Sequence, residues 1–121
     1  TTAAPFTVAS YMVEGEGSKN FVEVKRLMHR EPETFHALLD KLVESSAGYL
    51  VEQVKAGARV LQIFDTWAGE LAPDDLHAFA VTPVRRLIHK VRAAVGENVP
   101  VIYFARGCAD AFDEEPTRYA R

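Results

Sequence analysis

The apolar residues of the chain recur with two different periods, and this difference separates helices from strands. The clearest pattern follows Pro32, where apolar residues return every three or four positions over about six helical turns. This spacing predicts one long helix that ends near Gly57, since glycine is favoured just beyond the last turn. The buried stripe of this helix is predicted to be Phe35, Leu38, Leu39, Leu42, Val43, Ala47, Leu50, Val51 and Val54.

A second helical pattern begins at Pro73, with Asp74 and Asp75 in the first turn, where the helix dipole favours negative charge. Pro83 falls inside this pattern and is expected to kink or split the helix, which should end at residues 96–98. The predicted buried stripe is Leu76, Phe79, Ala80, Leu87, Ile88, Val91 and Val95. A shorter helix with Ser18 as its N-cap is predicted to bury Phe21, Val24, Leu27 and Met28.

Three short apolar runs predict strands at residues 6–9, 60–64 and 99–104. The second and third runs are almost entirely apolar, which is typical of parallel strands covered on both faces. Because long, helical segments connect the runs, the chain is predicted to be an α/β protein with a parallel βαβαβ segment. The pattern leaves two architectures open, the doubly wound sheet and the (β/α)8 barrel.

Composition narrows the possible functions of the chain. It has 121 residues, 48% of them hydrophobic and 26% charged, and a net charge of -3, which is typical of an ordinary globular domain. There is no basic run that would indicate nucleic-acid binding, and apolar stretches of about five residues are too short to cross a membrane. The single cysteine, Cys108, excludes an internal disulfide and fits a reducing compartment, so a cytoplasmic location is expected.

Functional groups of parallel α/β folds gather at the carboxyl ends of the strands. On the predicted strands these positions hold hydroxyl, acidic and basic side chains, which would suit an anionic ligand. Glu14, Asp65 and Asp110 could form a carboxylate pair there. The candidates are Ser10, Tyr11, Met12, Glu14, Asp65, Thr66, Trp67, Arg106 and Cys108.

Neither a phosphate loop nor a metal site is predicted. Residues 15–17 read Gly-Glu-Gly, without the third glycine of a dinucleotide fingerprint or the Gly-Lys ending of a P-loop. His36 and Asp40 are four residues apart, but no third ligand follows at a telling spacing, so they are predicted to lie on a solvated helix face. Cys108 has no cysteine or histidine partner that would make it a nucleophile.

Several linked motifs follow one another over residues 5–107. Residues 7–15 read Thr-Val-Ala-Ser-Tyr-Met-Val-Glu-Gly, and residues 62–69 read Gln-Ile-Phe-Asp-Thr-Trp-Ala-Gly. Together with the helix from Pro32 and the strand at 99–104, these motifs resemble the uroporphyrinogen decarboxylase family in sequence and in spacing. The resemblance implies a (β/α)8 barrel, of which residues 1–121 would be a central fragment of the single barrel domain, about a third of a complete enzyme. A start at Thr1 without an initiator Met fits a fragment.

The resemblance also implies a reaction, the removal of carboxyl groups from the four acetate side chains of uroporphyrinogen to give coproporphyrinogen, without a metal or organic cofactor. Tyr11 and Thr66 match substrate-contacting residues of the family, and Phe64 matches an apolar wall residue. The family's pivotal aspartate and arginine pair lie upstream and its histidine downstream, so Asp65 is not that aspartate and no catalytic residue is expected here. The isolated fragment is therefore expected to be inactive. The full-length enzyme is expected to be a homodimer.

Two other interpretations remain. The chain could be a non-catalytic βαβ assembly module, which would expose sheet edges. It could also resemble cobalamin-dependent methyltransferases that share the barrel and carry a His-x-Cys zinc pair on the third strand. Tyr103 and Ala105 stand at those two positions, which argues against a zinc site.

Overall fold

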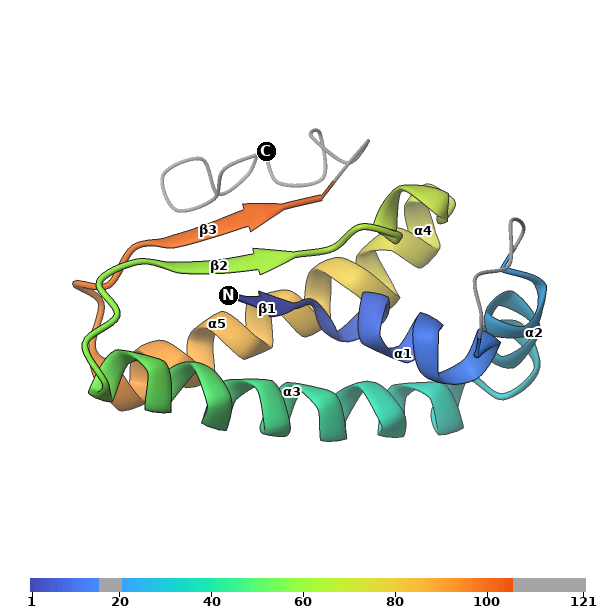
Figure 1. Ribbon diagram of the computed structural model, residues 1–121. Helices are drawn as coiled ribbons and strands as arrows, with labels where there is room; N and C mark the ends of the chain where they lie inside the picture. The colour runs from blue at the N-terminus through green and yellow to red at the C-terminus, as the bar shows by residue number, and fades with distance from the viewer. Residues whose placement is uncertain (16–20, 106–121) are drawn as a thin grey trace.

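Three parallel strands form the sheet of the computed structural model, which describes residues 1–15 and 21–105 (Figure 1). The strands are β1 (Thr2–Ala3), β2 (Leu61–Phe64) and β3 (Val101–Phe104), hydrogen-bonded in the order β1-β2-β3. Thr2 lies opposite Ile63 and Leu61 lies opposite Val101. The predicted α/β class and the parallel sheet are confirmed, while the described strands form an open sheet and not a closed barrel.

Helical segments connect these strands. They are α1 (Pro5–Glu14), α2 (Val22–Arg30), α3 (Pro32–Lys55), the short η1 (Ala68–Glu70), α4 (Pro73–Leu76), η2 (His77–Val81) and α5 (Thr82–Val95). The long helix predicted from Pro32 is confirmed as α3, which has 24 residues. Gly57, just beyond the end of α3, has a φ of 113°, a backbone conformation that residues other than glycine rarely adopt.

The strand predicted at residues 6–9 is wrong, because these residues belong to α1 and the first strand is the shorter β1. Pro5 is at the first helical position, where its missing N–H costs nothing. Phe6, Ala9 and Ser10 are buried at helical spacing. Tertiary packing thus overrides the β-propensity of a run too short to show its own period.

The described helices cover one face of the sheet. Figure 1 shows α1, α3 and α5 on the same side of β2 and β3. The side chains that point to them, Leu61, Ile63, Val101 and Tyr103, are buried. Side chains of the opposite face, here called the uncovered face, are Gln62, Phe64, Ile102 and Phe104, of which Ile102 and Phe104 are 39% and 45% exposed. The prediction that both faces are covered is therefore wrong for the described residues.

The interruption predicted at Pro83 takes the form of a π-helical turn. α4, η2 and α5 follow one another without a break, and η2 is the π-helical segment. The Thr82 N–H bonds the His77 carbonyl five residues back, and Pro83 then occupies the first turn of α5. The wider turn accommodates a proline without an N–H inside a continuous helix. Gly96 ends α5 with a φ of 85°, as predicted.

The short helix predicted around residue 24 is α2. Phe21, Val24 and Met28 are buried as predicted, and Leu27 is partly buried. The predicted N-cap, Ser18, lies outside the described residues. The Glu14 carboxylate instead accepts a hydrogen bond of 2.8 Å from the Val24 N–H, in the first turn of α2. No helix in the described part of the chain is long and apolar enough to cross a membrane.

Candidate functional site

A buried carboxylate stands directly after β2, at the carboxyl end of the sheet. Asp65 is 0% exposed. Its Oδ1 accepts a hydrogen bond of 2.5 Å from the Thr7 hydroxyl on α1, and its Oδ2 accepts one of 2.6 Å from the Tyr103 hydroxyl on β3. One side chain therefore joins the first helix to two neighbouring strands; we call Thr7, Asp65 and Tyr103 the carboxylate cluster.

The environment of Asp65 opposes its negative charge. Burial raises the pKa of Asp65 above its ordinary value of 3.8, because a low-dielectric interior disfavours the ionised form. Hydrogen bonds from Thr7 and Tyr103 lower the pKa and partly offset this effect. A fully buried carboxyl group that is held by two hydroxyl groups suits a structural tie better than a charge that must contact solvent.

The carboxylate cluster continues into an aromatic group around Trp67. The Trp67 backbone N–H lies 3.4 Å from the Thr7 hydroxyl oxygen, which accepts it. The indole ring packs edge-on against Tyr11, with ring centroids 6.3 Å apart, and at 5.0 Å against Phe21. Among the described residues, the buried indole Nε1 has no hydrogen-bond partner.

Phe21 holds an unusual backbone conformation beside Trp67. Its φ of 51° and ψ of 40° are in the left-handed region, which residues other than glycine rarely adopt. Such a conformation costs on the order of 1–3 kcal/mol and is concentrated near ligand sites. The Phe21 ring is buried and packs on Trp67, a contact that stabilises this conformation.

The three predicted substrate-contacting residues lie on α1 and at the end of β2. Tyr11 is 49% exposed on α1, and Thr66 is exposed directly before Trp67. Phe64 is partly buried and lies on the uncovered face of β2. The Tyr11–Trp67 contact brings α1 next to the turn that carries Thr66. All three side chains therefore lie at or near the carboxyl end of the sheet with surface open to a ligand.

Other candidates from the sequence do not join this arrangement. Ser10 is buried and its hydroxyl donates to the Phe6 carbonyl one turn back in α1. Glu14 is occupied with the first turn of α2, so the structure does not pair it with Asp65. Met12 is exposed, at 61%, on the same helix. Arg106, Cys108 and Asp110 lie outside the described residues.

The histidines do not form a metal centre within residues 1–15 and 21–105. His36 stacks on Phe79, with ring centroids 4.6 Å apart, and Asp40 pairs with Arg86. His29 Nε2 lies 3.0 Å from the Asp75 carboxylate on the surface. In this part of the chain no three histidine, cysteine or acidic side chains are grouped so that they could hold a metal ion.

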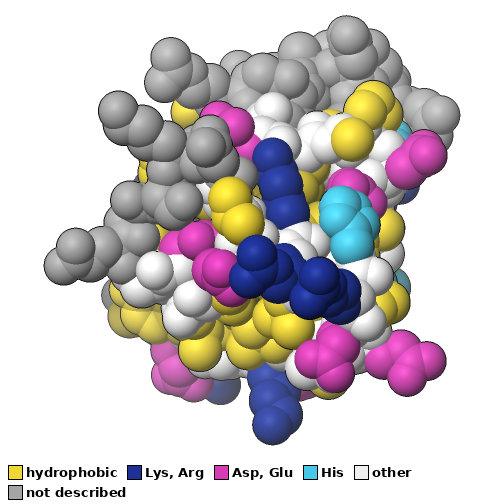
Figure 2. Space-filling model, turned by 90° about the vertical axis from the view of Figure 1, so that its right-hand side faces the viewer, with side chains coloured by type: hydrophobic (Ala, Val, Ile, Leu, Met, Phe, Trp, Pro, Cys, Tyr) yellow, Lys and Arg dark blue, Asp and Glu magenta, His cyan; other side chains and the backbone are white. Residues whose placement is uncertain are grey.

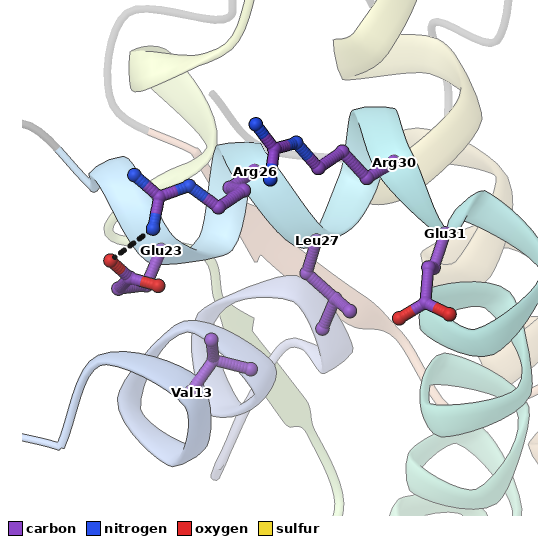
Figure 3. Close-up of a pocket in the computed structure, with 6 residues that line it drawn as sticks. All are labelled: Val13, Glu23, Arg26, Leu27, Arg30 and Glu31. Carbon is purple, nitrogen blue, oxygen red and sulfur yellow. Dashed lines mark hydrogen bonds and ion pairs between the residues drawn. The ribbon is translucent and has the colours of Figure 1, made fainter.

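A separate surface pocket of about 320 Å³ lies between α1, α2 and the start of α3 (Figure 3). Its lining residues are Val13, Glu23, Arg26, Leu27, Arg30 and Glu31. Arg26 is paired with Glu23 at 3.0 Å, so charges of both signs line the pocket. Figure 2 shows the end of the molecule that carries α2 and α4, where basic, acidic and apolar side chains are interspersed. This mixture does not favour one class of ligand.

Sequence reasoning missed the partners of Asp65. The run at residues 6–9 predicts a strand around Thr7, and the sequence gives Tyr103 no role beyond its strand and the position of a zinc ligand in other proteins. The one available signal was a polar hydroxyl within each otherwise apolar segment, since a buried hydroxyl needs a hydrogen-bond partner. Nothing in the sequence shows which residue that partner is.

Comparisons with known proteins extend this picture. The sequence model of the uroporphyrinogen decarboxylase (URO-D) family matches residues 1–117. A uroporphyrinogen decarboxylase of Citrifermentans bemidjiense is 46% identical over 104 residues, which are 86% of this chain and 30% of that protein. One of Geotalea daltonii is 44% identical over 110 residues, 91% of this chain and 32% of that protein. One of Desulfotalea psychrophila is 47% identical over 102 residues, 84% of this chain and 29% of that protein. The chain thus spans about a third of the length of these curated relatives.

Proposed function

Because the chain belongs to the uroporphyrinogen decarboxylase family, we propose that it forms the central part of the single barrel domain of a uroporphyrinogen decarboxylase. The complete enzyme would remove the carboxyl groups of the four acetate side chains of uroporphyrinogen and release coproporphyrinogen. It would be a carboxy-lyase of porphyrin biosynthesis that works in the cytoplasm as a homodimer.

The observation that supports the barrel is the uncovered face of the sheet. In a (β/α)8 barrel the helices cover the outside of the strands, and the inside faces the other strands. β2 and β3 have this division, with buried side chains toward the helices and exposed ones, including Ile102 and Phe104, on the other face. The uncovered face would be the barrel interior, which the remaining strands of the complete enzyme would cover.

Tyr11, Thr66 and Phe64 are the residues we propose for substrate contact. A porphyrinogen has carboxylate side chains around an apolar ring system. Hydroxyl groups at Tyr11 and Thr66 can donate hydrogen bonds to carboxylates, which accept strongly because they are charged. Phe64 supplies an apolar surface for a pyrrole ring, as in most small-molecule sites.

In this proposal, no metal or organic cofactor takes part. Protonation of a pyrrole carbon would turn the ring into the electron acceptor for the departing carboxyl group. Carbon dioxide leaves, and the electron pair of the broken C–C bond moves into the ring system. The remaining methylene carbon would then take up a proton and the ring carbon would lose one, which leaves the methyl group of the product. Residues of this segment would bind and orient the substrate. The groups that stabilise the cation would come from other parts of the enzyme.

The two alternative functions differ from this proposal in ways that the structure addresses. A methyltransferase of the same barrel would need zinc ligands on β3, but Tyr103 is buried toward the helices and its hydroxyl is bonded to Asp65. A non-catalytic module would need no exposed hydroxyl groups at the carboxyl end of the sheet. Tyr11 and Thr66 both offer such groups.

The direct test is the conversion of uroporphyrinogen to coproporphyrinogen by a complete protein that contains this chain, in buffer with a metal chelator. We expect turnover, and a loss of about 100-fold or more in kcat/KM when Tyr11→Phe and Thr66→Ala are combined, if each removes a hydrogen bond to a charged group worth about 1.5–3 kcal/mol. Absence of turnover in the unmutated protein would refute the proposed function.

Matched controls are available on α3. Tyr49→Phe and Thr34→Ala remove the same hydroxyl groups from exposed positions outside the candidate site and should leave kcat/KM unchanged. The 121-residue chain alone should show no turnover, and measurable turnover by it would contradict the view that the driving residues lie elsewhere. If the Tyr11 and Thr66 variants are as active as the controls, the site assignment is wrong although the family reaction stands.

A further inference from the structure

We propose that Asp65 is a positioning residue whose carboxylate fixes the helix carrying Tyr11 against the turn carrying Thr66. This inference rests on the proposed function, because it assigns Tyr11 and Thr66 to the substrate. Asp65 itself is fully buried and would not touch the substrate. Its role would be to set the distance between two substrate-binding hydroxyl groups that come from different elements.

Asp65 stands where the regular backbone pairing ends. The Ala4 N–H donates to the Phe64 carbonyl and the Asp65 N–H donates to the Phe104 carbonyl, both at 2.7 Å. After these bonds the chain that follows β1 enters α1, and the chain that follows β2 leads to η1. Here the side chain of Asp65 connects the end of β2 to α1 and β3, through its hydrogen bonds to Thr7 and Tyr103.

Each proposed substrate-binding residue is a near neighbour of a member of the carboxylate cluster. Thr7 lies four residues before Tyr11, so the two side chains lie on the same side of α1. On the other strand end, Thr66 lies between Asp65 and Trp67. The Trp67 N–H bonds Thr7, and the Trp67 ring packs against Tyr11. A shift of α1 relative to β2 would therefore change the distance between the Tyr11 and Thr66 side chains. The hydrogen bonds of the carboxylate cluster oppose such a shift.

A carboxylate is a costly group for this purpose, which argues that it has a specific use. Burying a carboxylate costs free energy unless its oxygens are hydrogen-bonded, and apolar residues of similar size often stabilise such sites more. Hydroxyl bonds to two oxygens have the advantage of direction, since they fix distance and angle, whereas apolar packing tolerates sliding. Orientation of this kind is what a site with groups from several elements requires.

The main test is Thr7→Val in the complete enzyme, which keeps the side-chain volume and removes the hydroxyl that joins Asp65 to α1. We expect kcat/KM for uroporphyrinogen to fall by about 10- to 100-fold, since small misplacements of binding groups have effects of this size. Thr7→Ser keeps the hydroxyl and should restore most of the activity. Ser10→Ala removes a buried hydroxyl from the same helix, without touching Asp65, and should stay within about two-fold of the unmutated enzyme.

A second readout distinguishes positioning from general damage. If Asp65 acts through Tyr11, Thr7→Val should cost much less in a Tyr11→Phe background than alone, because coupled residues are not additive. Tyr103→Phe, which removes the other bond to Asp65, should show the same coupling. Fully additive effects, or unchanged kcat/KM in folded Thr7→Val and Tyr103→Phe proteins, would overturn the proposal.

Amide hydrogen exchange tests the positioning without any activity assay. Thr7→Val should accelerate exchange in α1 and at residues 66–67, whereas Ser10→Ala should not affect residues 66–67. Unchanged exchange in Thr7→Val would refute the role of Asp65 even if the enzyme is a decarboxylase. Accelerated exchange in a protein without decarboxylase activity would support the tie and refute the proposed function alone.

Discussion

Two regions of the molecule are held together by different physics. The interface between α3 and α5 is an apolar layer, with Leu39, Val43, Leu87 and Val91 buried between the helices and the sheet. At the carboxyl end of the sheet, one carboxylate, Asp65, accepts directional hydrogen bonds from Thr7 on α1 and from Tyr103 on β3. The first region gains stability from area removed from water, and the second gains a defined geometry.

The comparison teaches where stability and function are separated in this chain. The apolar layer can lose a methyl group and keep its arrangement, since packing is non-directional. The carboxylate cluster contributes less free energy, but it lies next to Tyr11 and Thr66. Mutations in the first region should therefore affect unfolding and leave substrate binding unchanged, and mutations in the second should affect both unfolding and substrate turnover.

The largest expected effect on stability is at Leu39, which is fully buried in α3. Leu39→Ala removes three carbon atoms and leaves a cavity, so it should lower the free energy of unfolding of the complete protein by about 2–5 kcal/mol. Leu38→Ala, the same change at a partly buried neighbour, should cost clearly less. Denaturant unfolding measures both. KM for the substrate at a temperature where the variants are folded should not change; a large change in KM would break the comparison.

Thr7→Val should have a smaller effect on stability than Leu39→Ala. It removes a buried hydrogen bond to a carboxylate and the acceptor of the Trp67 N–H, at a cost of about 1.5–3 kcal/mol. Denaturant unfolding of Thr7→Val beside Leu39→Ala gives the ratio of stability loss to activity loss for each region. A Thr7→Val protein that loses stability but keeps full activity would show that the two regions do not differ in the way we describe.

The apolar layer could be predicted from sequence, and the carboxylate cluster could not. The stripe of α3 repeats over 24 residues, so its period is unambiguous, and β2 and β3 are apolar runs between turn signals. The bond from Thr7 to Asp65 spans 58 residues, and no local rule links them. Sequence patterns report which side chains are buried, but not which distant polar groups meet.

The misassigned first strand has the same origin. Four residues at 6–9 are too few to distinguish a period of two from one of 3.6, and β-branched Thr7 and Val8 then favoured a strand. The motif resemblance, which implies that Tyr11 contacts the substrate, does not depend on this strand, because it rests on spacing along the chain and not on the local structure. Tyr11 lies on a helix, and it still faces Trp67 beside Thr66.

The pH dependence of stability should report the buried carboxylate. Between the ordinary pKa of 3.8 and the raised pKa in the folded protein, the folded state keeps the proton that the unfolded state has released. Stability therefore falls as the pH rises through this window and levels off above the raised pKa, with a slope of up to about 1.4 kcal/mol per pH unit. Asp65→Asn, which cannot ionise, should lose this contribution.

The measurement is the difference in unfolding free energy between the unmutated protein and Asp65→Asn across the acidic range, because the other carboxyl groups cancel in that difference. The difference should change in favour of Asp65→Asn as the pH rises. A change in the opposite direction would mean that the hydrogen bonds from Thr7 and Tyr103 outweigh the effect of burial. The cluster would then stabilise the charge more than burial penalises it.

The smallest expected effect is at the outer surface of the helical layer, where α3 and α5 are joined by two ion pairs. Arg86 lies 2.6 Å from Asp40, and Lys90 lies 2.5 Å from Glu44. The side chains of Arg86 and Asp40 are 45% and 55% exposed, so water and salt screen the attraction. A double-mutant cycle with Arg86→Ala and Asp40→Ala should give a coupling of about 0.2–1 kcal/mol that shrinks further in high salt. A coupling as large as the stability cost of Thr7→Val would mean that polar contacts stabilise the helical layer as strongly as the carboxylate cluster. The two regions would then differ only in how far their polar groups are buried.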